Sequence, residues 1–268
     1  MNHPHFHSHV CRLFLVIPLL CVLFAAVTAS GRTWYVLPDS TGDAPDIQAA
    51  IDSSGDGDTV LVAAGTYYVN LQITGITDFT LISESGPEVT ILDGSPSFNP
   101  QYRQVVRVFQ SPDALVEGFT IQNANPSTIA GWGGGIRIIG GGRVTIRGNI
   151  IRANNSKSRG GGLAFSNPCE GCGGSVIEGN QFIENTCSNN AAGIWIYGVD
   201  DGCVFIKNNL FQGNVGGYGG IRAEYSNIIL TNNIFMANES TSYCLDIVGT
   251  GRVEGNLVVL NEGGGDRC

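Results

Sequence analysis

The sequence predicts an all-β fold, a single-stranded parallel β-helix of roughly eight coils that follows a short capping helix. Three observations predict it. A unit with two asparagines returns at intervals of 31, 29, 24 and 23 residues, apolar and polar residues alternate around it, and no long segment after residue 55 has helical periodicity. Repeats of about 20 to 30 residues are typical of solenoids, in which each unit buries its apolar face by stacking on its neighbours.

The N-terminal segment 1–30 is predicted to be a secretory signal peptide. It has one positive charge, Arg12, then an apolar run from Leu13 to about Val27 and small residues at its end. The run is shorter than the roughly 20 residues of a membrane-spanning helix, which favours export over anchoring. The expected location is therefore secreted, periplasmic or cell-surface, with no membrane span after cleavage.

This segment also determines which chemistry the mature chain can perform. All four histidines of the chain lie inside it: His3, His5, His7 and His9. The mature chain therefore has no histidine, which excludes Ser-His-Asp catalysis, Cys-His catalysis and histidine ligands to a metal.

The segment that follows, residues 31–58, is predicted to contain the capping helix. Its stretch "DAPDIQAAIDSS" (43–54) has Ile47, Ala50 and Ile51 on one face of a short amphipathic helix. A helix in this place would cover the first coil and block pairing with its edge.

The β-helix itself is predicted over residues 59–268. The early coils, at 58–73, 78–94 and 104–125, lack the asparagine unit, but their alternation still predicts short strands with one face buried. The chain stops at "NEGGGDRC", just after a coil. Either the sequence is truncated there, or a disulfide or a partner covers that edge.

The repeated asparagines are predicted to form a structural ladder. Coils stacked about 4.8 Å apart place each asparagine above the last, where the amides can bond along the stack and satisfy the backbone at a turn. Phe182, Phe211 and Phe235, two places after a leading asparagine, would form an internal stack. The leading asparagines are Asn149, Asn180, Asn209, Asn233 and Asn256, and their partners five places later are Asn154, Asn185, Asn214, Asn238 and Asn261.

A second recurring unit, seen in "GGGIRII", "GGGLAFS", "AAGIWIY" and "YGGIRAE", predicts an outward-facing surface. Alternation along these strands places two rows of side chains outside the coil. The first row is Arg137, Ala164, Trp195, Arg222 and Asp246, and the second is Ile139, Ser166, Tyr197, Glu224 and Val248.

Two N-terminal stretches carry a family resemblance. "IQAAIDSSGDGDTVLVAAGTY" (47–67) followed by "TLISESGPEVTILDG" (80–94) resembles the amino-terminal signature of secreted bacterial right-handed β-helix proteins of the pectin-lyase-like superfamily. The resemblance covers essentially all of the mature chain and implies a right-handed coil. It is specific for fold and not for activity, since the superfamily includes polysaccharide lyases, glycoside hydrolases, epimerases and surface proteins without known chemistry.

In the enzymes of that superfamily the substrate groove commonly runs along the outer face of one parallel sheet, so the outward rows are the candidate site. Arg137, an exposed Trp195 and Tyr197 are the candidate substrate-binding residues. Aromatic rings stack on sugar faces, and arginine pairs with the carboxylates of an acidic polysaccharide. The rival interpretation is a solvated sheet face with scattered aromatic residues.

The nearest candidate catalytic set is Arg222, Glu224 and Asp246. The resemblance implies that a lyase could use an arginine base beside calcium-holding acids, and a hydrolase would need two carboxylates at a suitable separation. The clustered aspartates and the arginine-rich signature of the superfamily's enzymes are not recognisable in this sequence, so whether the chain is an enzyme stays open.

Calcium is the candidate cofactor, with Asp200 and Asp201 of "GVDDG" as candidate ligands. One Asp pair lacks the six or more oxygens that calcium prefers, so a polar turn is the competing interpretation. The cysteines favour disulfides in an exported protein, although four of them could instead hold zinc. The disulfide candidates are Cys169, Cys172, Cys187, Cys203, Cys244 and Cys268.

The charge of the chain limits its partners. A formal net charge of −9 is unsuited to a general nucleic-acid footprint. Two functions therefore remain. The first is an exported protein that binds, or acts on, an acidic polysaccharide along one outer sheet face. The second is a non-catalytic surface or structural β-helix module of a longer exported protein. The oligomeric state, the substrate and the linkage do not follow from the sequence.

Overall fold

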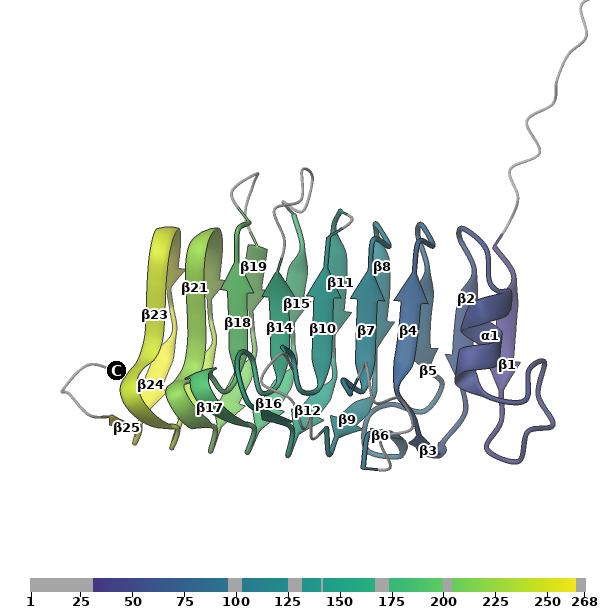
Figure 1. Cartoon of the computed structure of the whole chain (residues 1–268), viewed down its shortest axis with the longest axis horizontal. Coiled ribbons are helices and arrows are strands. Elements are labelled where there is room, and N and C mark those ends of the chain that lie inside the picture. The colour runs from purple at the N-terminus through teal and green to yellow at the C-terminus, as the bar shows by residue number, and fades with distance from the viewer. Residues whose placement is uncertain are drawn as a thin grey trace, which may run out of the picture.

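The computed structural model describes residues 31–95, 103–124, 132–140, 142–166, 174–199 and 204–263. Within these residues the chain winds as a parallel β-solenoid of about 7 turns, with a single helix near its N-terminal end (Figure 1). All recorded strand pairings are parallel and join one coil to the next, as in Ile136–Ile139 beside Leu163–Ser166. The predicted fold class is confirmed.

Each coil contributes to three faces. The first face contains β1 (Thr33–Val36), β2 (Thr59–Val62), β5 (Thr80–Ser83), β8 (Ala114–Glu117), β11 (Val144–Arg147), β15 (Val176–Glu178) and β19 (Val204–Lys207). The second face is an 8-stranded sheet, and one turn of the solenoid separates each of its strands from the next. Its strands are β3 (Gly65–Tyr68), β6 (Thr90–Asp93), β9 (Thr120–Gln122), β12 (Ile150–Arg152), β16 (Gln181–Ile183), β20 (Leu210–Gln212), β22 (Ile234–Met236) and β24 (Leu257–Val259).

The third face contains β4 (Leu71–Thr74), β7 (Val106–Phe109), β10 (Ile136–Ile139), β14 (Leu163–Ser166) and β18 (Ile194–Tyr197). Two longer strands, β21 (Val215–Thr231) and β23 (Glu239–Glu254), pass through the third face and continue into the first. Short strands lie where the second face bends into the third: β13 (Asn155–Ser156), β17 (Thr186–Ala191) and β25 (Glu262–Gly263).

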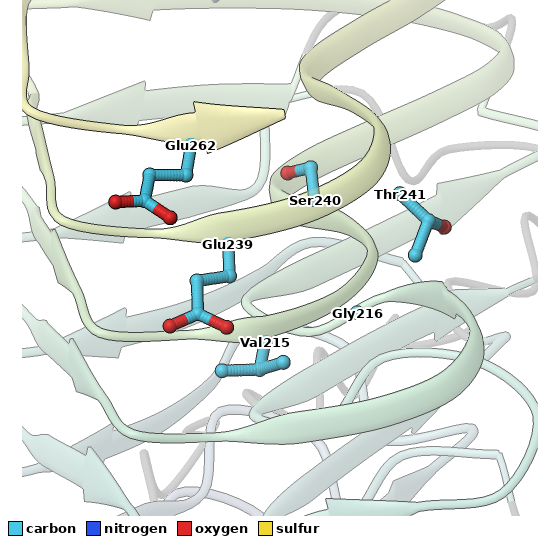
Figure 2. Close-up of a pocket in the computed structure, with 6 residues that line it drawn as sticks. All are labelled: Val215, Gly216, Glu239, Ser240, Thr241 and Glu262. Carbon is cyan, nitrogen blue, oxygen red and sulfur yellow. The ribbon is translucent and has the colours of Figure 1, made fainter. Parts of the chain in front are cut away.

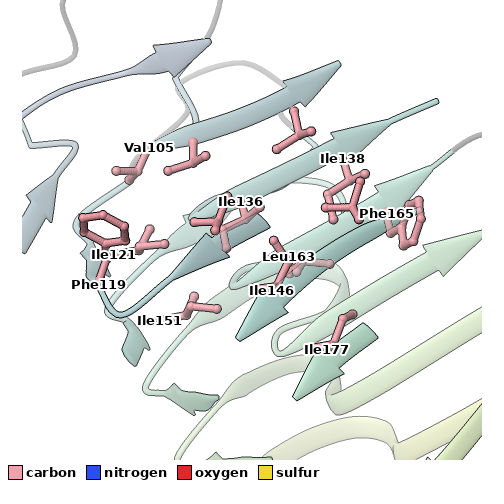
Figure 3. Packing of buried hydrophobic residues seen from close by; sticks show 14 of the residues in the cluster. Val105, Phe119, Ile121, Ile136, Ile138, Ile146, Ile151, Leu163, Phe165 and Ile177 are labelled. Carbon is pink, nitrogen blue, oxygen red and sulfur yellow. The ribbon is translucent and has the colours of Figure 1, made fainter. Parts of the chain in front are cut away.

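The core is a column of apolar side chains that point inward from all three faces (Figure 3). The predicted internal aromatic stack is confirmed. The rings of Phe182 and Phe211 lie 4.9 Å apart and 4° from parallel, and those of Phe211 and Phe235 lie 4.6 Å apart and 5° from parallel. These three side chains are buried.

The phenylalanine stack explains why glycines recur before the strands of the third face. A Cβ atom on Gly162 would lie 2.8 Å from Cδ1 of Phe182, and one on Gly193 would lie 2.9 Å from Cδ1 of Phe211. Both distances are below van der Waals contact, so any side chain there would displace a stacked ring. At these positions the glycine of one coil therefore lies against the phenylalanine of the next coil.

The asparagine ladder is also confirmed, and each asparagine after the first accepts hydrogen bonds through its Oδ1 from the asparagine of the preceding coil. The backbone N–H and the Nδ2 of Asn180 both donate to Oδ1 of Asn209 in the following coil, at 2.9 and 3.1 Å. Nδ2 of Asn180 also donates to the carbonyl of Ile146 in the preceding coil, at 2.8 Å. The same pattern links the other ladder positions, and the two ladders begin where Asn149 and Asn154 accept the backbone N–H groups of the coil before them.

The capping helix is α1 (Ile47–Ser53). Asp46 caps its N-terminus, since the carboxylate accepts the N–H of Ala49 at 2.8 Å. Ile47, Ala50 and Ile51 are buried as the sequence predicts. In chain order α1 stands between β1 and β2 of the first face, so it takes the place that a strand of the third face would have before β4 (Figure 1).

Candidate functional site

The third face brings the predicted outward residues into register. Across β10, β14, β18, β21 and β23, each residue of the first row stands beside its counterpart in the next coil, and so does each residue of the second row. The first row extends two coils further toward α1, through Arg107 of β7 to Gln72 of β4. Neighbouring coils lie about 4.8 Å apart, so the face presents side chains at a regular spacing along the solenoid axis.

The predicted exposure of Trp195 is wrong. Its side chain is 0% exposed and forms a small apolar cluster outside the coil with Ala164 and Ala191, against which Trp132 and Tyr218 pack. Trp132 meets its ring edge-on at 5.4 Å, and Arg159 lies 4.7 Å from its centroid. Trp195 points outward as alternation requires, but residues from neighbouring coils cover it.

Trp195 is tied to the three candidate catalytic residues by polar contacts. Its indole Nε1 donates to Glu224 at 2.7 Å, and the other oxygen of Glu224 lies 2.8 Å from Arg222. Arg222 also contacts Asp246 at 3.3 Å. The structure therefore brings Arg222, Glu224 and Asp246 together, with the guanidinium held between two carboxylates. All three side chains are about one-fifth exposed, which leaves them accessible from the outer surface.

Sequence reasoning missed several residues of this face, among them Arg107, Trp132 and Arg159. Arg107 extends the first row, and its Nη1 donates to Oε1 of Gln72 at 3.1 Å. Trp132 and Arg159 occupy equivalent positions before the glycines of "WGGGI" and "RGGGL" and form a parallel bridge between coils. The alternation in "VVRVF" and the shared position before the glycines are the signals that would have found them.

Arginine and aromatic side chains alternate along this surface. The guanidinium of Arg137 lies 5.3 Å from the centroid of Trp132, and that of Arg159 lies 4.4 Å from the same ring. Arg222 lies 4.5 Å above Tyr218, where burial raises the pKa of the phenol. These distances are typical of cation–π interactions, and such interactions hold the guanidinium groups in place without neutralising their charge.

Two exposed tyrosines complete the surface. Tyr197 is 41% exposed and stacks on Trp195 at 5.6 Å, and Tyr225 is 67% exposed and meets Tyr197 edge-on at 5.7 Å. We define the arginine face as Gln72, Arg107, Trp132, Arg137, Arg159, Trp195, Tyr197, Arg222, Glu224, Tyr225 and Asp246. It has four arginines and two carboxylates in a chain whose formal net charge is −9. The arrangement can pair with anionic groups and stack against flat apolar rings.

A separate hollow of about 300 Å³ lies near the last described coils (Figure 2). It is lined by Val215, Gly216, Glu239, Ser240, Thr241 and Glu262. Glu239 and Glu262 are partners in adjacent coils, so their carboxylates stand one above the other. Ser240 lines this hollow too, and its hydroxyl oxygen already accepts the N–H of Gly219 at 2.7 Å.

The described part of the chain contains no group of ligands for the predicted metal ion. There, no set of three or more His, Cys, Asp or Glu side chains is placed to hold a metal ion. Asp200 and Asp201, the predicted calcium ligands, lie outside the described residues. The calcium site therefore stays a prediction.

Two of the six disulfide candidates are described. Cys187 and Cys244 are buried thiols that form no disulfide within the described residues. Burial raises the pKa of Cys187, which keeps its thiol protonated and unreactive. Cys169, Cys172, Cys203 and Cys268 lie outside the described residues, so their pairing stays a prediction.

Comparison with known proteins gives a family and several distant structural neighbours. A family model described as the right handed beta helix region matches residues 104–268. Two solved structures of the pectin methylesterase from Aspergillus niger, in penultimately deglycosylated and deglycosylated forms, share 18% and 17% identity with this chain at TM-scores of 0.39 and 0.37. Each alignment covers 89% of this chain and 87% of the other. No curated protein matches the chain.

Proposed function

The chain belongs to the right handed beta helix family, and we propose that it binds an acidic polysaccharide along the arginine face. The family is defined by its fold, so the proposal depends on the residues of the site and not on membership. The observation that carries it is the set of four guanidinium groups, two of them in adjacent coils, that lie among aromatic rings on one outer sheet face of an acidic chain.

The geometry suits a linear polymer with a negative charge on each unit. Arg107 and Arg137 stand in adjacent coils, about 4.8 Å apart along the axis, and Arg159 extends the positive surface toward Trp195. Arginine recognises carboxylates through two parallel hydrogen bonds, so each guanidinium can receive one uronate group. The exposed rings of Tyr197 and Tyr225 offer apolar surface to the sugar faces.

The same geometry favours binding over proton abstraction. A general base must accept a proton, and the guanidinium of Arg222 is a donor group held between Glu224 and Asp246. Its two ion pairs stabilise the cation, which has no free electron pair to offer. Arg222 therefore serves best as an anchor that orients the two carboxylates and Tyr218.

The test compares retention of the protein on immobilised pectate, alginate and chondroitin. The double substitution Arg107→Gln with Arg137→Gln removes two charges from the arginine face. Each lost carboxylate pair corresponds to about a tenfold weakening, or about 1.4 kcal/mol, so the double variant should bind about a hundredfold more weakly. The wild-type affinity should also fall as salt is raised, because the contacts are charged and partly exposed.

The matched control is Arg143→Gln with Arg147→Gln. These arginines lie at and beside β11 on the first face, where they pair with Asp113 and Glu117 at the surface. The control removes the same charge and should leave retention unchanged. Equal losses of affinity in both double variants would show that only the net charge of the protein matters. If the wild-type protein is retained on none of the three polymers, the result would favour a structural module. Release of unsaturated uronate during the assay would show a lyase and overturn the assignment of Arg222 as an anchor.

A further inference from the structure

The arginine face has two different ends. Toward the last described coils it continues onto β23, where Asp246 and Val248 stand beside Arg222 and Glu224. Toward the N-terminus it continues through Arg107 to Gln72 of β4 and then meets α1. No strand of the third face precedes β4 in the described residues, because α1 takes that place.

Helix α1 closes the edge of β4 through a side chain. Oε1 of Gln48 accepts the backbone N–H of Gln72 at 2.8 Å, and Nε2 of Gln48 donates to the carbonyl of Gln72 at 3.1 Å. These are the two bonds that a neighbouring strand would make. The amide of Gln48 thus replaces a strand and fixes the helix against the face.

A helix in the place of a strand forms a step. With its side chains a helix is about 10 to 12 Å wide, whereas a strand is one layer thick. The inner side of α1 is buried and its residues Asp52 and Ser53 are exposed, so the helix rises beside the outward side chains of β4. Figure 1 shows α1 beside the row of third-face strands, at the end next to β4.

The corner between the step and the face is hollow and polar. A hollow of about 430 Å³ is lined by Ile51, Asp52 and Ser54 from α1 and its C-terminal end, and by Gln72, Thr74 and Ile76 from β4 and the residues after it. Nε2 of Gln72 is buried and makes no hydrogen bond within the described residues, whereas Oε1 of the same side chain accepts from Arg107. A buried donor without an acceptor is costly, and a ligand oxygen would satisfy it.

We infer that this corner receives the end of the polysaccharide chain, so that the arginine face binds its polymer by a terminus and not along an internal segment. The inference rests on the proposed function. The terminal sugar places hydroxyl groups against Asp52, Ser54, Thr74 and the Nε2 of Gln72. The carboxylate of Asp52 repels a uronate group there, and Arg107, one coil further, attracts it. The polymer then extends along the face toward β23, away from the step.

The experiment measures binding as a function of chain length. The polymer retained most strongly in the screen of pectate, alginate and chondroitin is used at full length and as oligomers longer than the face, which spans about 30 Å across seven strands. All samples contain the same mass of uronate, and binding is followed by calorimetry. Recognition of an end predicts that apparent affinity per unit mass rises as chains are shortened, by a factor equal to the ratio of chain lengths. Affinity per unit mass that does not change with length would overturn the inference and leave the proposed function intact.

Two variants assign the effect to the corner. Gln72→Leu removes the unsatisfied amide, and Thr74→Val removes a hydroxyl from the hollow without touching the contact between Gln72 and Arg107. Both should lose the dependence on chain length and bind short oligomers severalfold more weakly. The matched control, Thr145→Val on β11 of the first face, should behave as wild type. Unaltered length dependence in both corner variants would place the end recognition elsewhere and overturn the inference, whereas failure of the wild-type protein to bind any polymer would remove the proposed function itself.

Discussion

The asparagine ladder and the arginine face are both columns of side chains that stack from coil to coil, yet they differ in composition. The ladder repeats one residue at each level, and its members are buried or half-buried. The first outward row of the third face, from which the arginine face is built, changes at almost every level, through Gln72, Arg107, Arg137, Ala164, Trp195, Arg222 and Asp246. Both columns have the same spacing, so the spacing does not explain the difference.

The difference follows from what each column must satisfy. At the ladder, every coil presents the same backbone N–H and carbonyl groups, and one amide of fixed geometry satisfies them all. On the outer face the backbone is already paired, so its side chains are free to vary with the surface that the protein presents. In this solenoid, repetition marks structure and variation marks the candidate site.

The largest expected effect comes from breaking the ladder in its middle. Asn209→Ala should lower the free energy of unfolding by about 4 kcal/mol, since it leaves several buried polar groups without a partner, each costing about 1–3 kcal/mol. These groups are the backbone N–H of Asn180 and one of its two Nδ2 hydrogens, which are donated to Asn209, and the carbonyl of Ile177, which accepts from Asn209. Denaturant unfolding followed by circular dichroism measures the loss.

The control for this substitution is Gln181→Ala, one place from the ladder on β16. Its side chain is only half-buried and belongs to no ladder hydrogen bond in the described residues. The stability of this variant should change little. Equal losses for Asn209→Ala and Gln181→Ala would contradict the structural role assigned to the repeat.

The second-largest effect concerns Trp195, which is buried although it belongs to the outward-facing arginine face. Trp195→Ala should lower the free energy of unfolding by about 3 kcal/mol, because it empties a packed site against Ala164 and Trp132. Trp195→Phe keeps most of the packing and removes the N–H donated to Glu224, which should cost about 1 kcal/mol. Thermal and denaturant unfolding of the two variants measure whether Trp195→Ala loses more stability than Trp195→Phe.

Polymer binding by Trp195→Phe and Tyr197→Ala distinguishes a buried ring that only supports the face from an exposed ring that contacts the polymer. Trp195→Phe should keep most of the affinity, because the ring is hidden from solvent, whereas Tyr197→Ala should lose severalfold, because its ring is exposed. Greater loss in Trp195→Phe than in Tyr197→Ala would show that the cluster opens and that Trp195 contacts the ligand directly.

The smallest effect concerns Asp93, a charged residue at the end of β6 in an early coil, in contrast to the neutral asparagines of the ladder. Burial raises the pKa of Asp93, but hydrogen bonds from Ser95, Gln122 and Asn123 outweigh it and hold the pKa below its ordinary value. A depressed carboxyl pKa contributes stability above its unfolded value of about 3.9, and this stability is lost as the pH falls through the folded value.

Unfolding midpoints measured from pH 7 downward should therefore decline below about pH 4. Asp93→Asn should remove part of that decline, and the ladder residues should contribute none because amides do not titrate in this range. The loss at low pH should be smaller than either stability effect above. An identical acid profile in wild type and Asp93→Asn would show that the carboxylate is not held by these bonds.

Much of this fold could be predicted from the sequence because a solenoid repeats its local rules. The interval between asparagines set the coil length, alternation set the inward and outward residues, and Phe182, Phe211 and Phe235 stack as their spacing requires. The register of Arg137, Trp195, Arg222 and Asp246 followed from the same periodicity. Each of these properties depends on residues within one coil and its neighbour.

Burial on the outer face could not be predicted in this way. Alternation shows that Trp195 points outward, but its cover comes from Trp132 and Arg159, which precede strands of other coils. The union of Arg222 with Glu224 and Asp246 likewise depends on side-chain conformations across two coils. The step at α1 arises because the helix occupies a strand's place.

The sequence by itself therefore determined the coil, its core and the direction in which each side chain leaves the backbone, because period and spacing are properties of the chain. Only the tertiary structure decided which outward side chains meet solvent, which of them neutralise one another, and where the arginine face ends. Those outcomes depend on contacts between residues that are distant in sequence, and no local pattern encodes them.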